Sequence, residues 1–168
     1  ILPGRFYALL GENGCGKSTL MRMLVGIEAP DMGEVVLRGY PVGQAPVEAR
    51  NMLAYVSESL NFEIKADMLG VAHILAQLYP GWDWELFHRI VKERKFPIKK
   101  HFRECSRGQK MQFCLAVGLC QGARVLLLDE ITSVLDVYAR TYFMAHLSDF
   151  VKKGGTVLMA TNIIHEVQ

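Results

Sequence analysis

The sequence predicts an α/β fold in which a mostly parallel sheet is flanked by helices and carries an inserted helical segment. Short apolar runs alternate along the chain with stretches of helical periodicity, as is typical of open parallel sheets. The chain has 168 residues, 51% of them hydrophobic and 21% charged, which is enough apolar sequence for one buried core. We therefore expect one folded domain spanning 1–168.

Each element follows from a local pattern of apolar residues and turn signals. The expected strands are Phe6–Leu10, Glu34–Leu37, Leu53–Val56, Val125–Leu128 and Thr156–Ala160. The expected helices are Lys17–Val25, Asp67–Tyr79, Asp83–Lys95, Ser106–Cys120 and Val137–Lys152, bounded by capping residues and Gly or Pro stops. We assign 1–61 and 122–168 to an α/β core and 62–121 to a helical subdomain.

Composition argues against several classes of protein. Lys and Arg total 19 against 17 Asp and Glu, a net charge of +2, which gives no electrostatic signature of nucleic-acid binding. No apolar run approaches the roughly 20 residues of a membrane span, so direct membrane insertion is not expected. The four cysteines form no CxxC pair and no zinc-ligand cluster, which favours free thiols in a reducing, cytosolic compartment.

The segment from Gly11 to Thr19 matches G-x-x-x-x-G-K-[ST] between an expected strand and an expected helix. Glycines at these positions let backbone N–H groups surround a phosphate, and the helix N-terminus adds partial positive charge. Lys17 can reach the β- and γ-phosphates, and the Ser18 hydroxyl can ligate Mg²⁺. The residues assigned to nucleotide binding here are Gly11, Asn13, Gly14, Cys15, Gly16, Lys17, Ser18 and Thr19. A glycine-rich turn with a chance lysine is the simpler alternative, and the agreement of motif, strand and helix disfavours it.

A second apolar run ends in two carboxylates. It carries Asp129 to the carboxyl end of the expected strand, where ligands bind in open α/β sheets. Asp129 can hold Mg²⁺, and Glu130 can polarise an attacking water. A solvated acidic turn is the alternative, and it is weaker here because the phosphate loop belongs to the same sheet.

With these motifs in place, the chain resembles the ATP-binding cassette (ABC) ATPase family along nearly its whole length. Cys105–Gln109 falls where that family has its LSGGQ signature, a segment that kinases and GTPases lack. Ser133–Asp136 resembles the D-loop, and Asn162 falls at the switch-histidine position. Within that family, the sequence most resembles the ATPase subunit of an exporter-type transporter.

The resemblance implies that two cassettes, identical or different, close head to tail around two ATP molecules. Each ATP, with Mg²⁺, would touch the phosphate loop of one subunit and the signature residues Ser106, Gly108 and Gln109 of the other. It implies Glu130, Lys17 and Asn162 as catalytic residues, a transmembrane permease partner, and a cytoplasmic location at the inner face of the membrane. Ser106 and Gln109 also predict a capping box, and ordinary helix capping is compatible with the functional role.

Four positions depart from the family pattern. Glu58 stands where a Gln usually links Mg²⁺ and water to the membrane partner, and its carboxylate is a candidate metal ligand with Ser18 and Asp129. Arg107 replaces the first signature glycine, and either a phosphate contact or solvent exposure fits it equally well. Ile131 replaces a Pro. Asn162 replaces the histidine and can donate a hydrogen bond but cannot take up a proton near neutral pH.

These departures bear on the hydrolysis rate more than on ATP binding. His165 is more simply explained as a surface helix residue than as a substitute for the switch histidine. The family has two further strands and an adenine-stacking aromatic before the segment that begins at Ile1, and it continues past Gln168, so we expect a sequence truncated at both ends.

The first hypothesis is therefore a transport ATPase. The alternative is a non-transport or degenerate cassette that acts as a slow ATP-dependent clamp or regulator. A small-molecule kinase is a third possibility, against which the signature and D-loop segments argue.

Overall fold

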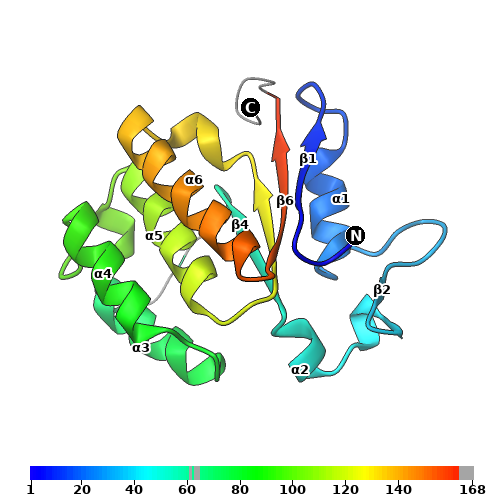
Figure 1. Cartoon of the computed structure of the whole chain (residues 1–168), viewed down its shortest axis with the longest axis horizontal. Coiled ribbons are helices and arrows are strands. Elements are labelled where there is room, and N and C mark those ends of the chain that lie inside the picture. Colours follow the sequence, from blue (N-terminus) through cyan, green and yellow to red (C-terminus); the bar gives the residue numbers. More distant parts are fainter. Residues whose placement is uncertain (61, 63–64, 163–168) are drawn as a thin grey trace.

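The computed structural model describes residues 1–60, 62 and 65–162, and its frame is a four-stranded sheet with the order β1-β6-β5-β4 (Figure 1). These strands are β1 (Phe6–Leu10), β4 (Leu53–Ser57), β5 (Val125–Asp129) and β6 (Thr156–Thr161). All three neighbouring pairs are parallel, with Asp129 opposite both Ser57 and Ala160. The carboxyl ends of the strands therefore share one edge, as the sequence predicted.

A separate antiparallel hairpin consists of β2 (Val36–Leu37) and β3 (Tyr40–Pro41). The turn between them has φ of 52° at Arg38 and 87° at Gly39. Two successive left-handed residues are what a two-residue hairpin turn requires. The expected strand Glu34–Leu37 is thus shorter than predicted and lies outside the parallel sheet.

The longer helices have bounds close to those expected. They are α1 (Lys17–Leu24), α3 (Met68–Leu78), α4 (Trp84–Arg94), α5 (Arg107–Cys120) and α6 (Val137–Lys152). The side chains of Asp67, Asp83 and Asp136 each accept a hydrogen bond from the first turn of α3, α4 and α6, which fixes where those helices begin. The sequence did not predict the short segments α2 (Val47–Arg50), η1 (Val42–Gln44), η2 (Phe102–Glu104) and η3 (Ile131–Val134).

Side chains alternate between the two faces of the sheet. Leu126 and Leu128 of β5 join the core cluster that contains α5 and α6, whereas Leu127 packs with Met21 of α1. Strand β6 alternates in the same way, with Leu158 on the α1 side. The sheet is therefore covered on both faces, which explains its continuous apolar strands.

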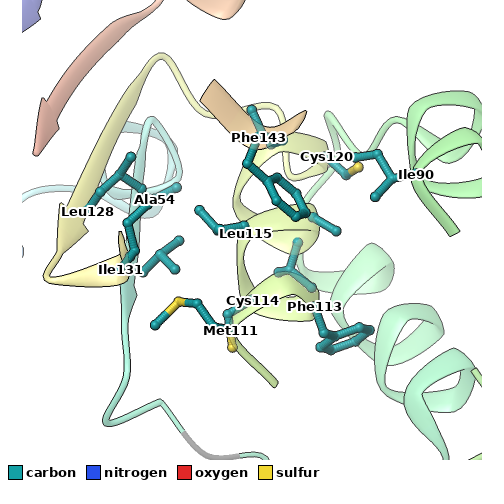
Figure 2. Close-up of a cluster of buried hydrophobic side chains, with 14 of the residues drawn as sticks. Ala54, Ile90, Met111, Phe113, Cys114, Leu115, Cys120, Leu128, Ile131 and Phe143 are labelled. Atoms are coloured by element: carbon teal, nitrogen blue, oxygen red, sulfur yellow. The ribbon is translucent and has the colours of Figure 1, made fainter. Parts of the chain in front are cut away.

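The helices between β4 and β5 share one core with the sheet. Residues 111–120 of α5 are all buried. Figure 2 shows Leu115 directed toward Ala54 and Leu128 of the sheet, while Phe113 points away from it. A Cβ on Gly118 would lie 2.8 Å from Val56 Cγ2, so α5 approaches β4 too closely for a larger residue there.

Because the core is continuous, the assignment of 1–61 and 122–168 to one part and 62–121 to another stays a prediction. Among the described residues, no helix is both long and apolar enough to cross a membrane.

Candidate functional site

The phosphate-loop segment connects β1 to α1 at the carboxyl edge of the sheet. Gly16, the residue before α1, has φ of 96°, and no side chain caps the first turn. A Cβ on Gly14 or Gly16 would meet no atom within 4 Å, so the loop is open above the helix N-terminus. Thr19 lies one turn on and accepts a hydrogen bond from Arg22. Uncapped N–H groups in an open loop suit an anion.

Lys17 is the buried cation of this loop, with 5% of its surface exposed. Its Nζ donates hydrogen bonds to the carbonyl oxygens of Gly11 and Glu12, both at 2.9 Å. The same nitrogen lies 3.2 Å from Glu130 Oε1. The structure therefore brings the predicted phosphate-binding amine and the predicted catalytic carboxylate into direct contact.

Asp129 lies beside Ser18, as the sequence predicted. Ser18 Oγ donates to Asp129 Oδ1 at 3.0 Å, and the aspartate is 6% exposed. Its second oxygen, Oδ2, accepts a hydrogen bond from the Tyr55 hydroxyl, also at 3.0 Å. Burial raises the pKa of Tyr55, so the hydroxyl keeps its proton and acts as a donor.

Sequence reasoning assigned no role to Tyr55, because its position relative to Asp129 depends on how β4 pairs with β5. In the observed register, Tyr55 pairs with Leu127 and Ser57 pairs with Asp129. Tyr55, Leu127 and Asp129 consequently face the same side of the sheet, toward α1 and Ser18.

Glu130 has a φ of 50°, in the left-handed region that non-glycine residues rarely occupy. Its N–H donates to Ala160 O at 3.0 Å, and its carbonyl accepts a hydrogen bond from Ser133 Oγ at 3.1 Å. Neighbouring strand and turn thus hold an unfavourable backbone that turns the carboxylate toward Lys17. Residues held in this way cluster at functional sites.

Asn162 follows β6 and reaches the phosphate loop. Its Nδ2 donates to Asn13 Oδ1 at 3.0 Å, so the amide lies beside the phosphate loop, and its predicted catalytic role stays a prediction. His165 falls outside the described residues.

The signature segment forms a second group. Ser106 and Gln109 make the predicted capping box, with Ser106 Oγ accepting from Gln109 N at 3.2 Å and Gln109 Oε1 accepting from Ser106 N at 3.0 Å. Ser106, Gly108 and Gln109 line a pocket of about 280 Å³ together with Asp136. None of these residues lies in the contacts that join Lys17, Ser18, Asp129 and Glu130.

Glu58 contacts the signature segment and not the Lys17 cluster. Its carboxylate forms a two-point ion pair with Arg107, in which Arg107 Nη2 donates to Oε2 at 2.6 Å and Nε contacts Oε1. The hydrogen bond to Glu58 raises the pKa of Arg107. The structure brings Ser18 and Asp129 together but places Glu58, the third candidate metal ligand, against the signature helix. Arg107 keeps 73% of its side chain exposed, as one of the two expectations has it, and it also pairs with Glu58, which neither expectation included.

The chemistry of the cluster fits a magnesium nucleotide. A hydroxyl and a carboxylate 3.0 Å apart are the hard oxygen ligands that Mg²⁺ takes alongside phosphate.

The exposed Cys15 lies in the open loop, whereas the other cysteines, Cys105, Cys114 and Cys120, are buried and also free.

Comparison with known proteins agrees with this chemistry. A family model described as "ABC transporter" matches residues 1–133. The chain is 32% identical to the Nod factor export ATP-binding protein I of Burkholderia lata, with 100% of this chain and 57% of that protein covered. It is 33% identical to the putrescine transport ATP-binding protein PotG of Escherichia coli, with 96% and 44% covered. The chain thus spans about half the length of the curated relatives it matches.

A solved dimeric structure of an ATP-binding cassette, in a post-hydrolysis state bound to ADP and Pi, superposes with a TM-score of 0.81 at 21% identity. The superposition covers 97% of this chain and 77% of that one, which confirms the predicted P-loop NTPase fold. Because the relatives include proteins named for both import and export, the exporter-type subdivision stays a prediction. The family match over most of the chain means that this protein belongs to the ABC transporter family.

Proposed function

We propose that this chain binds Mg²⁺ and ATP at the carboxyl edge of its sheet, hydrolyses the ATP, and thereby powers transport by a membrane permease. One observation carries the proposal: a buried lysine contacts Glu130 at 3.2 Å while Ser18 contacts Asp129 at 3.0 Å. Cation, metal ligands and carboxylate base are thus gathered beside an open phosphate loop.

Each residue has a defined role in this proposal. Backbone N–H groups of the loop and the Lys17 amine bind the phosphates, and Ser18 with Asp129 holds the metal. Mg²⁺, when bound, neutralises phosphate charge and fixes the geometry of the transferring group. Glu130 accepts a proton from the attacking water, and the bond between the β- and γ-phosphates breaks to release ADP and inorganic phosphate.

Lys17 has to exchange partners for this to happen. Its Nζ is engaged by two loop carbonyls and by Glu130. Phosphate oxygens are stronger acceptors than carbonyls, so the amine turns toward the nucleotide and releases the Glu130 carboxylate for water.

A second copy would complete the site. The separation of Ser106, Gly108 and Gln109 from the Lys17 cluster supports a head-to-tail dimer in which each signature serves the other subunit. The dimeric form of the related cassette also supports it. A permease partner and a position at the inner face of the membrane follow from the transport roles named for the relatives.

The alternative function is a slow ATP-dependent clamp. The engagement of Glu58 by Arg107 favours it, because that carboxylate is then withheld from the metal. Asn162 favours it too, because an amide cannot carry a proton.

The experiment measures phosphate release from Mg-ATP as a function of protein concentration. We expect turnover per subunit to rise with concentration, because two copies form each site, and to vanish in Lys17→Ala. Concentration-independent turnover would contradict the dimer. ATP binding without turnover in the wild type would select the clamp.

Removing Arg107 is expected to lower the Mg²⁺ concentration required for half-maximal ATP binding, because Glu58 is released from its ion pair. Because Arg107 is exposed, its ion pair with Glu58 is weak, and the change should be at most about fivefold. Arg103→Ala, an exposed arginine in η2, is the matched control and should leave the Mg²⁺ requirement unchanged. An unaltered requirement in Arg107→Ala would show that Glu58 does not contribute to metal binding.

A further inference from the structure

We infer that Tyr55 is a positioning residue that orients the Asp129 carboxylate for Mg²⁺. The inference rests on the proposed Mg-ATP site and adds to it a residue from β4, a strand that supplies none of the motif residues of the phosphate loop. The observation behind it is the hydrogen bond from the Tyr55 hydroxyl to Asp129 Oδ2 at 3.0 Å.

The two oxygens of Asp129 have separate partners. Oδ1 accepts from Ser18 Oγ at 3.0 Å, and Oδ2 accepts from Tyr55. A carboxylate held at only one oxygen can rotate about its Cβ–Cγ bond. The two hydroxyls, which come from α1 and β4, together fix the plane of the group and keep Oδ1 directed at Ser18.

The Tyr55 ring is itself held in place. It packs against the apolar cluster that contains Met21 and Leu127, between α1 and the sheet. Its backbone pairs with Leu127 of β5, so Tyr55 and Asp129 are carried by adjacent, hydrogen-bonded strands. The hydroxyl position is therefore set by strand register and packing, which are established before any ligand binds.

Residues that hydrogen-bond to a metal ligand commonly change metal affinity by 10–100-fold when they are replaced. We therefore expect Tyr55→Phe to raise the Mg²⁺ concentration needed for half-maximal binding of a fluorescent ATP analogue by about 10–100-fold. Binding of the same analogue in EDTA and the thermal midpoint should remain at wild-type values, because Phe keeps the ring and its packing.

Tyr7→Phe is the matched control. Tyr7 lies on β1, packs against the same apolar cluster, and accepts a hydrogen bond from Leu2 N at 2.9 Å rather than contacting Asp129. The Tyr7→Phe variant also loses a tyrosine hydroxyl beside this apolar cluster. Its Mg²⁺ dependence should nevertheless match that of the wild type.

A double substitution tests whether Tyr55 affects the Mg²⁺ requirement through Asp129 or through the structure as a whole. If Tyr55 acts through the carboxylate, Tyr55→Phe should change the Mg²⁺ requirement by less than about twofold when Asp129→Asn is already present. A full effect in that background would overturn the inference.

The remaining outcomes are also distinct. A Tyr55→Phe protein with the Mg²⁺ dependence of Tyr7→Phe overturns the inference alone. Equal losses with and without Mg²⁺ also overturn it, because they indicate a structural role. A wild-type protein without any Mg²⁺-dependent ATP binding refutes the proposed function itself.

Discussion

Glu130→Gln is expected to reduce phosphate release by at least about 100-fold while ATP binding persists. Glutamine has the same shape but cannot accept the proton of the attacking water. It also removes the negative charge 3.2 Å from Lys17 Nζ, so nucleotide affinity should be equal to or higher than that of the wild type. The measurements are steady-state phosphate release and equilibrium binding of a fluorescent ATP analogue.

The matched control is Glu48→Gln, which makes the same change in charge at an exposed position in α2. It should retain wild-type turnover. If Glu130→Gln hydrolysed ATP at a rate within a fewfold of the wild type, another group would have to act as the base. Joint loss of binding and turnover would instead mean that the Glu130 contact with Lys17 is needed to hold the loop together.

The parts of the fold that the sequence predicted well have local causes. Helix α6 covers Val137–Lys152 as expected, because Asp136 caps its start and a glycine pair follows its end. The capping box at Ser106 and the cluster of Lys17, Ser18 and Asp129 also follow from short motifs. In each case, the residues that decide the structure are neighbours or belong to one recognisable pattern.

The features that the sequence did not predict depend on contacts between distant segments. Glu58 and Arg107 are 49 residues apart, and nothing local indicates that β4 ends beside the start of α5. The role of Tyr55 required the strand register between β4 and β5. Segments as short as α2, with four residues, cannot display a helical period at all.

The left-handed backbone at Glu130 also depends on a contact between distant segments. A glutamate has no local preference for φ of 50°, and the conformation is imposed by the hydrogen bond from its N–H to Ala160 O on β6. The geometry of the proposed catalytic carboxylate is therefore a property of the assembled sheet rather than of the Asp-Glu pair in the sequence.

The second large effect concerns the core that positions the signature helix. Phe113→Ala is expected to reduce the free energy of unfolding by about 3–5 kcal/mol, the usual cost of deleting a buried aromatic ring. Phe113 is fully buried, and its ring centroid lies 5.9 Å from those of Phe62 and Phe102 and 6.3 Å from that of Phe87. These rings come from different segments, so no single neighbour can close the cavity.

Thermal and urea unfolding would measure the loss, which corresponds to a fall in the midpoint of roughly 6–20 °C for a domain of this size. Tyr138→Ala, which removes an aromatic ring that is 83% exposed, is the control and should change stability by less than about 0.5 kcal/mol. Equal stability of the two variants would contradict the aromatic cluster. Because Phe113 anchors α5 two turns after Ser106, the same substitution should loosen the signature residues, and hydrogen exchange at the start of α5 should rise with it.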